Sequence, residues 1–139
     1  MEKEFIPINL ALRLKALGFK ERVLTYYEDG KPKLHTAIEG WDFNSSFLNC
    51  VSRPTYSQAF RWFREKYGLV SAVLPFQDVE DNIKLCYYYC VVDLGECQDE
   101  DILCNESSLG TSDINFSSYE EAELACLIKL IEIVENKTK

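Results

Sequence analysis

Apolar residues recur at the three- and four-residue spacing of a helix face in three segments of this chain, residues 8–17, 55–67 and 119–136. Gly18 follows the first segment and Gly68 the second, as expected of residues that end helices. Thr55 with Gln58 forms a capping box at the start of the second segment, although a start at Ser52 with Pro54 in the first turn is also possible. Ser118 with Glu121, or Ser117 with Glu120, forms a capping box at the start of the third. Three helices are therefore predicted.

Residues that favour β-strands dominate the segment after the first helix. Arg22–Tyr27 and Lys33–Ile38 flank an Asp29-Gly30 step, which is typical of a two-residue hairpin turn. The next segment, Glu39–Arg53, is rich in Gly, Asn, Ser and Asp, and we predict an ordered loop there. Its anchors are expected to be aromatic side chains, namely Trp41, Phe43 and Phe47.

A second hairpin is predicted between the last two helices. Its strands are Leu69–Leu74, which Pro75 is expected to end, and Ile83–Val92. The acidic segment Asp93–Asp113 is predicted to be a loop, followed by a short fifth strand at Ile114–Phe116. The predicted class is α+β, a small antiparallel sheet packed with three helices in the order α-β-β-α-β-β-(β)-α. A single domain over residues 1–139 is expected from the length.

The net charge of −8 at pH 7 disfavours several function classes. An acidic protein repels the phosphate backbone of nucleic acids, so general DNA or RNA binding is not expected. The N-terminal residues lack the basic and apolar regions of a signal peptide, and no apolar run approaches the ~20 residues that span a bilayer. We therefore expect a cytoplasmic protein without a membrane span.

Six cysteines and one histidine are the residues that most invite a catalytic or metal-binding interpretation. Without an export signal, the cysteines are expected to be free thiols. Nothing in the spacing links His35 to a cysteine. Cys86 and Cys90 are four residues apart on a predicted strand, which separates them by about 13 Å, too far for one zinc ion. No catalytic residue, metal or cofactor is expected.

The second helix and its approach concentrate positive charge and aromatic rings within this acidic chain. Guanidinium groups pair with phosphate, aromatic rings stack on bases, and a helix N-terminus offers backbone N–H groups to anions. This segment therefore predicts a site for a small anionic ligand that resembles a nucleotide. Its candidate contacts are Arg53, Thr55, Tyr56, Arg61, Trp62, Arg64 and Lys66.

A solvated amphipathic helix explains the same segment without any ligand. In this interpretation Arg61 pairs with Glu65 four residues later. Trp62 lies beside the apolar stripe that faces the core, and the stripe consists of Tyr56, Ala59, Phe60, Phe63 and Tyr67. The sequence leaves both interpretations open.

Three stretches carry a resemblance to other proteins: EFIPINLALRLKALGF, PTYSQAFRWFREKYGL and YEEAELACLIKLIEIVENK. They resemble a family of small proteins of bacteriophages and mobile elements. The resemblance implies a phage-encoded protein that acts inside a bacterial cell, and it supplies no catalytic residues to carry over.

The expected function is non-enzymatic binding, in which the protein sequesters a small anionic nucleotide that serves as an immune signal of the host. One alternative is a protein-interaction module that inhibits a host defence enzyme, and another is an enzyme that processes nucleotides. A homo-oligomer is also expected, because apolar residues occupy most of the circumference of the C-terminal helix.

Overall fold

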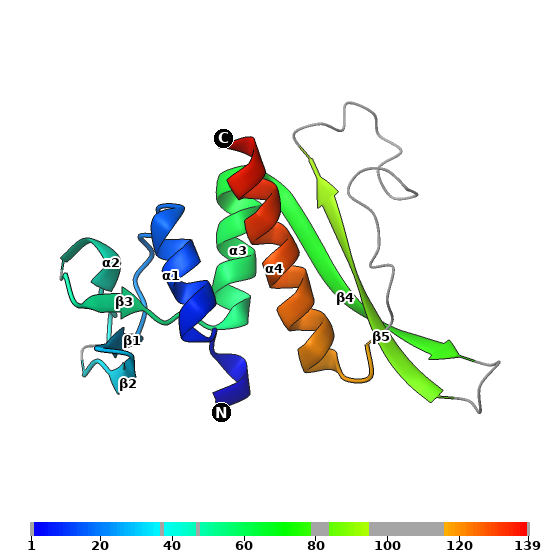
Figure 1. The fold of residues 1–139 in the computed structure, drawn as a ribbon, viewed down its shortest axis with the longest axis horizontal. Coiled ribbons are helices and arrows are strands. Elements are labelled where there is room, and N and C mark those ends of the chain that lie inside the picture. The colour runs from blue at the N-terminus through cyan, green and yellow to red at the C-terminus, as the bar shows by residue number, and fades with distance from the viewer. Residues whose placement is uncertain (1, 37, 47, 79–83, 95–115, 139) are drawn as a thin grey trace. The chain divides into compact units, whose positions relative to one another are not determined.

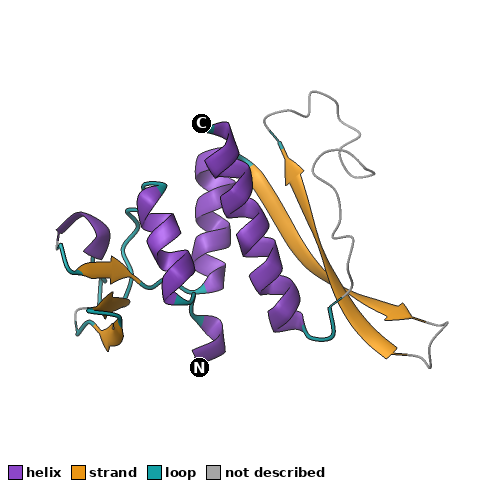
Figure 2. Cartoon of the chain, viewed as in Figure 1, coloured by secondary structure: helices purple, strands orange, loops and turns teal. Residues whose placement is uncertain are grey.

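The computed structural model describes residues 2–36, 38–46, 48–78, 84–94 and 116–138, which form a mixed α+β fold (Figure 1). Within these ranges lie four α-helices and two antiparallel sheets, of three and two strands (Figure 2). The predicted class is confirmed, although the two hairpins belong to separate sheets. The chain divides into two compact units, Met1–Trp62 with Val134–Lys139 and Phe63–Ile133. The single domain expected from the length stays a prediction.

Helix α1 (Ile8–Ala16) follows a short 3-10 turn, η1 (Glu2–Glu4), and ends at the predicted glycine. Gly18 has a φ of 94° and donates its backbone N–H to the carbonyl three residues back. Phe19 donates its backbone N–H to the carbonyl of Leu14, five residues back. This pair of bonds is a Schellman motif, which a glycine permits because it tolerates positive φ.

The three-stranded sheet has the order β2-β1-β3, with β1 at Thr25–Glu28, β2 at Lys31–Leu34 and β3 at Cys50–Ser52. The connection between β1 and β2 is the predicted Asp29-Gly30 turn, with φ values of 52° and 79°. Positive φ at both positions is the type I′ turn of a tight hairpin. The first hairpin is confirmed, with shorter strands than predicted.

The segment predicted as an ordered loop contains a helix and a strand, α2 (Phe43–Ser46) and β3. The Asp42 carboxylate accepts the backbone N–H groups of Asn44 and Ser45 and so begins α2. The Asn44 amide donates to the Phe19 carbonyl, and its oxygen accepts the backbone N–H of Ser52. Side-chain hydrogen bonds to the backbone stabilise this short helix, whose sequence has no helical periodicity of apolar residues. Phe47 lies outside the described residues.

Helix α3 (Tyr56–Tyr67) begins at the predicted capping box and ends at Gly68, which has a φ of 67°. Thr55 Oγ1 accepts the backbone N–H of Gln58 at 3.2 Å, and Gln58 Oε1 accepts the backbone N–H of Thr55 at 2.9 Å. Each side chain thus satisfies one backbone donor at the start of the helix.

The second sheet pairs β4 (Leu69–Asp78) with β5 (Lys84–Asp93), so the prediction that Pro75 ends the strand is wrong. Pro75 lies opposite Tyr87, whose backbone N–H and carbonyl both bond to Phe116 instead. The pair is therefore a non-hydrogen-bonded one, and β4 does not need the N–H that proline lacks. Phe116 forms a single bridge to β5, and the rest of the predicted fifth strand lies outside the described residues.

Helix α4 (Tyr119–Lys137) begins with the Ser118 hydroxyl accepting the backbone N–H of Glu121. Its larger apolar side chains, Tyr119 apart, are buried or half-buried in the single chain. Oligomerisation through α4 stays a prediction. In the ranges given above, no helix is long and apolar enough to cross a bilayer.

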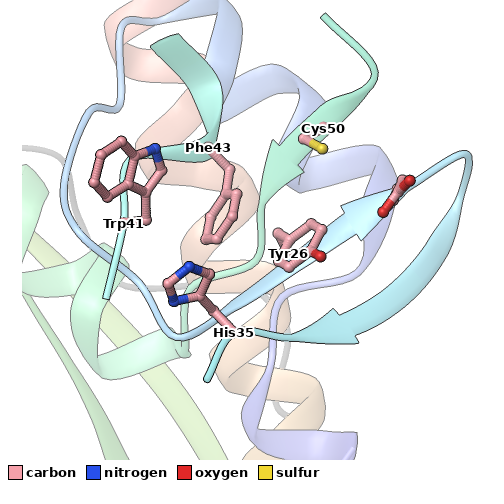
Figure 3. Close-up of a pocket in the computed structure, with 6 residues that line it drawn as sticks. Tyr26, His35, Trp41, Phe43 and Cys50 are labelled. Carbon is pink, nitrogen blue, oxygen red and sulfur yellow. The ribbon is translucent and has the colours of Figure 1, made fainter. Parts of the chain in front are cut away.

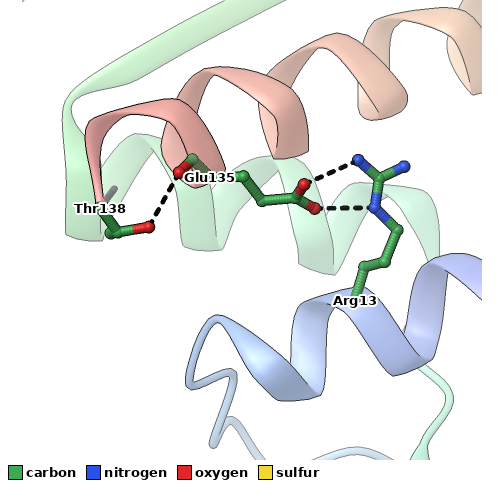
Figure 4. Close-up of polar contacts among 3 residues, drawn as sticks. All are labelled: Arg13, Glu135 and Thr138. Atoms are coloured by element: carbon green, nitrogen blue, oxygen red, sulfur yellow. Dashed lines mark hydrogen bonds and ion pairs between the residues drawn. The ribbon is translucent and has the colours of Figure 1, made fainter.

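An ion pair joins α1 to the last turn of α4 (Figure 4). Arg13 donates from Nε and Nη2 to the two carboxylate oxygens of Glu135, at 2.7 and 3.1 Å. The Thr138 hydroxyl donates to the Glu135 backbone carbonyl at 3.0 Å. Both members of the pair are about one-third exposed, so solvent screens much of their attraction.

Candidate functional site

Arg53, the first of the predicted ligand contacts, is a buried structural residue with 6% of its surface exposed. Its Nη2 donates to the Glu2 carboxylate at 2.7 Å. Its guanidinium carbon lies 4.4 Å from the ring centroid of Phe5 and 5.3 Å from that of Tyr27. Among the described residues, Arg53 Nε has no hydrogen-bond partner. Arg53 therefore holds the N-terminal segment against the sheet and presents no open face to a ligand.

Thr55 and Tyr56 also serve the fold. The Thr55 hydroxyl and backbone N–H are both used in the capping box of α3. Tyr56 is 8% exposed, and its ring lies tilted against that of Phe60 at 6.2 Å. Both residues therefore contribute to the fold, Thr55 through hydrogen bonds and Tyr56 through packing.

Trp62 packs inside the protein, so its predicted place beside the apolar stripe is wrong. It is 4% exposed, and its ring meets that of Phe19 edge-on at 5.3 Å. Phe60 is only half-buried. The buried stripe therefore consists of Tyr56, Ala59, Trp62 and Phe63. Both stripes satisfy helical spacing, and the observed one buries the larger indole ring.

The remaining predicted contacts, Arg61, Arg64 and Lys66, are exposed on α3. The Lys66 ammonium lies 5.6 Å from the ring centroid of the neighbouring Tyr67. No ion pair between Arg61 and Glu65 is present in the described structure. The predicted contacts are thus split between buried structural residues and exposed cations, and they do not form one binding surface.

A pocket of about 430 Å³ lies instead beside the three-stranded sheet (Figure 3). From the sequence, Trp41 and Phe43 were predicted only as anchors of a loop, and no contact between them and the hairpin was predicted. The lining residues come from β1, the end of β2, α2 and its approach, and β3, and they are Tyr26, Glu28, His35, Trp41, Phe43 and Cys50.

The sheet register places the pocket residues on one face. Tyr26 and Glu28 alternate along β1 and lie opposite Ser52 and Cys50 of β3. Directly paired residues of antiparallel strands point to the same side, so Cys50 shares the face of Glu28. His35 is fixed next to this face by its backbone N–H, which donates to the Leu24 carbonyl at 2.7 Å.

Trp41 reaches the pocket through a tight turn at Gly40. Trp41 exchanges backbone hydrogen bonds with Val23 at 2.9 and 3.0 Å. Gly40 has a φ of 69°, and a Cβ atom there would lie 2.8 Å from the Val23 carbonyl oxygen. Only glycine fits this close backbone approach, and it thereby positions the indole.

The rings in the pocket are ordered against one another. Tyr26 and Phe43 are stacked, with centroids 4.1 Å apart and an interplanar angle of 16°, and His35 meets Phe43 edge-on at 5.4 Å. Phe43 is 3% exposed, whereas Trp41 is 46% exposed. In Figure 3 the Phe43 ring lies between those of Trp41 and Tyr26. The pocket thus has a fixed aromatic wall and an accessible indole.

Negative charge dominates the electrostatics of the pocket. Among the lining residues that the structure describes, Glu28 carries the one carboxylate or cationic side chain apart from the imidazole of His35. Burial raises the pKa of the Cys50 thiol, Glu28 and Asp29 raise that pKa further, and Lys15 opposes them. Lys15 Nζ donates to the Cys50 carbonyl at 3.0 Å. A thiol with a raised pKa is ionised less often and is therefore a weaker nucleophile.

The described part of the chain holds no group of three or more His, Cys, Asp or Glu residues arranged to bind a metal ion. Four cysteines in that part are free thiols, Cys50, Cys86, Cys90 and Cys126. Cys97 and Cys104 lie outside it, so the prediction that all six are free is confirmed only for these four.

Comparisons with known proteins found no relative of this chain. No family model matches the chain, and no curated protein or solved structure matches it significantly. The resemblance to bacteriophage proteins therefore stays a prediction.

Proposed function

We propose that this chain is a non-enzymatic binding protein that holds a planar ring of a small ligand in the aromatic pocket. The observation that carries the proposal is the pocket of about 430 Å³, lined by Tyr26, Trp41, Phe43 and the imidazole of His35. Its volume falls within the roughly 300–1,000 Å³ of small-molecule sites. Aromatic walls attract planar rings by offset stacking and edge-to-face contact. The neutral Cys50 thiol favours binding over covalent catalysis.

The ligand class expected from the sequence, a small nucleotide signal, fits this pocket in one orientation. The base would enter the pocket, and the phosphate groups would stay outside because Glu28 repels them. Lys31 and Lys33 lie opposite Glu28 and Tyr26 on β2, hence on the same side of the sheet, and both are exposed. These lysines, in place of the cations of α3, are the proposed phosphate contacts. Sequestration of a defence signal in a phage-infected cell is the proposed role.

Equilibrium dialysis against a panel of linear and cyclic nucleotides tests the proposal. Bound ligand is released by heating and identified by chromatography, and we expect to recover it unaltered. Base stacking on an aromatic side chain contributes about 1–3 kcal/mol. Trp41→Ala should therefore weaken uptake about tenfold. Leu34→Ala is the matched control, because Leu34 is 71% exposed on the same hairpin but lies on the opposite face of the sheet.

Three results would contradict the proposal. Uptake that is equal in the wild type and in Trp41→Ala would place the ligand elsewhere. Recovery of an altered nucleotide would indicate an enzyme. A wild-type protein that takes up no ligand from the panel would favour the interaction module.

The interaction module has an observation of its own. Leu74 and Phe76 are two residues apart on β4, so they point to the same side of the second sheet, and they are 38% and 42% exposed. Adjacent exposed apolar side chains favour contact with another protein. Leu74→Ser with Phe76→Ser should abolish such an interaction and leave nucleotide uptake unchanged, whereas loss of uptake would show that this face serves the ligand.

A further inference from the structure

The carboxylate of Glu28 lies at the end of β1 and lines the aromatic pocket. Glu28 is half-buried on β1 and forms no ion pair or side-chain hydrogen bond with any described residue. Its cross-strand neighbours on the same face are Lys31 and Cys50. An ionised carboxylate accepts hydrogen bonds at both oxygens and donates none. A ring that covered Glu28 without offering donors would displace the water bound to the carboxylate and form no hydrogen bond in its place, which is unfavourable.

This requirement separates the ring edges that the pocket can accept. A ring with acceptors turned toward Glu28 is repelled, and a ring with one N–H donor satisfies a single oxygen. A ring with two adjacent N–H donors satisfies both oxygens in a planar, bidentate arrangement, which adds geometric specificity to charge-assisted bonding. Guanine carries such an edge, formed by its ring N1–H and its exocyclic amino group. Adenine presents an amino group beside an acceptor nitrogen.

We propose that Glu28 selects the ligand by accepting two adjacent N–H donors, so that the pocket takes guanine-type rings and rejects adenine-type rings. This inference rests on the proposed function, because it requires a ring in the pocket. It assigns Tyr26, Trp41 and Phe43 the role of holding the plane of the ring and Glu28 that of reading its edge. The hairpin turn at Asp29-Gly30 fixes the end of β1 and therefore the position of this carboxylate.

Three nucleosides without phosphate groups test the selection on the wild-type protein. Guanosine has both donors, inosine lacks the exocyclic amino group, and adenosine replaces the N1–H donor with an acceptor. Loss of one charge-assisted hydrogen bond weakens binding by about tenfold or more. We expect guanosine to bind about tenfold more tightly than inosine, and inosine more tightly than adenosine. Fluorescence reports binding, because Trp41 lines the pocket and Trp62, the other tryptophan, is buried in a different place.

Glu28→Gln and Asp29→Asn form a matched pair of variants. Each removes one negative charge next to Cys50, but only Glu28 lines the pocket. The asparagine is compatible with the φ of 52° at position 29, because Asn-Gly suits the same turn. We expect Glu28→Gln to lose about tenfold in guanosine affinity and to lose the preference over adenosine. Asp29→Asn should stay within about twofold of the wild type.

The outcomes separate the two proposals. If none of the three nucleosides binds the wild type, the proposed function fails. If they bind equally, or if adenosine binds best, the selection by Glu28 fails and the ring-binding function stands. Equal losses in Glu28→Gln and Asp29→Asn would indicate a general effect of charge and would overturn direct contact. The nucleoside series on the wild type decides the question even if Glu28→Gln does not fold.

Discussion

Replacement of Trp62 by alanine tests whether the indole of α3 packs the protein or stacks on a ligand. A buried tryptophan removes about 150–250 Å² from water, which at about 25 cal/mol per Å² gives roughly 4–6 kcal/mol. Residual structure in the unfolded chain lowers this figure, and core substitutions of this kind cost about 3–5 kcal/mol. Because Trp62 is 4% exposed and meets Phe19 edge-on, we expect a loss of about 4 kcal/mol in the free energy of unfolding.

The assay is urea denaturation followed by far-ultraviolet circular dichroism, since the substitution removes a fluorophore. In a thermal melt followed by the same signal, each kcal/mol corresponds to about 4 °C in Tm for a chain of this size, so Tm should fall by about 16 °C. Two neighbours on α3 are the controls. Arg61→Ala, at an exposed position, should change stability by less than ~0.5 kcal/mol, and Phe60→Ala, at a half-buried one, should lose less than Trp62→Ala. A loss below ~1 kcal/mol for Trp62→Ala would refute the buried stripe.

Three further predictions follow from particular contacts. Gly40→Ala should lose at least ~2 kcal/mol more free energy of unfolding than Gly30→Ala in denaturant titrations. Both glycines have positive φ, but only at position 40 would the added Cβ lie 2.8 Å from a backbone carbonyl oxygen. Equal losses would contradict the close approach. Burial raises the pKa of Cys126 to about 12, so this thiol is protonated at pH 8 and should resist iodoacetamide in the folded protein, as mass spectrometry can verify; rapid labelling would show that the site opens. A double-mutant cycle on Arg13 and Glu135 should give a coupling of about 0.5–1 kcal/mol that shrinks in 1 M salt, and a coupling insensitive to salt would argue against a screened pair.

Features that depend on a few neighbouring residues were determined by the sequence. The Asp29-Gly30 turn, the end of α1 at Gly18 and the Thr55–Gln58 capping box all occur where predicted. In each case the hydrogen bonds or the tolerance of positive φ involve residues at most five positions apart. The α+β class follows from the same local periodicities, because helix and strand patterns alternate along the chain.

Features that depend on packing were decided only by the tertiary structure. Helical spacing allows either Phe60 or Trp62 on the buried stripe, and contact with Phe19 selects Trp62. Pro75 continues β4 because the backbone of Tyr87, the residue opposite, forms its hydrogen bonds with Phe116 and not with β4. This depends on the register of the strands, which the residue type does not determine.

The candidate site belongs to the second group. Its residues come from four separate segments between positions 26 and 50, and none of the segments carries a motif. Trp41 and Phe43 meet Tyr26 and Glu28 only because the hairpin folds back and the backbone at Gly40 passes against Val23. The sequence therefore determined the turns that allow this arrangement. The joining of the rings and one carboxylate into a pocket required the long-range pairing of β1 with β3.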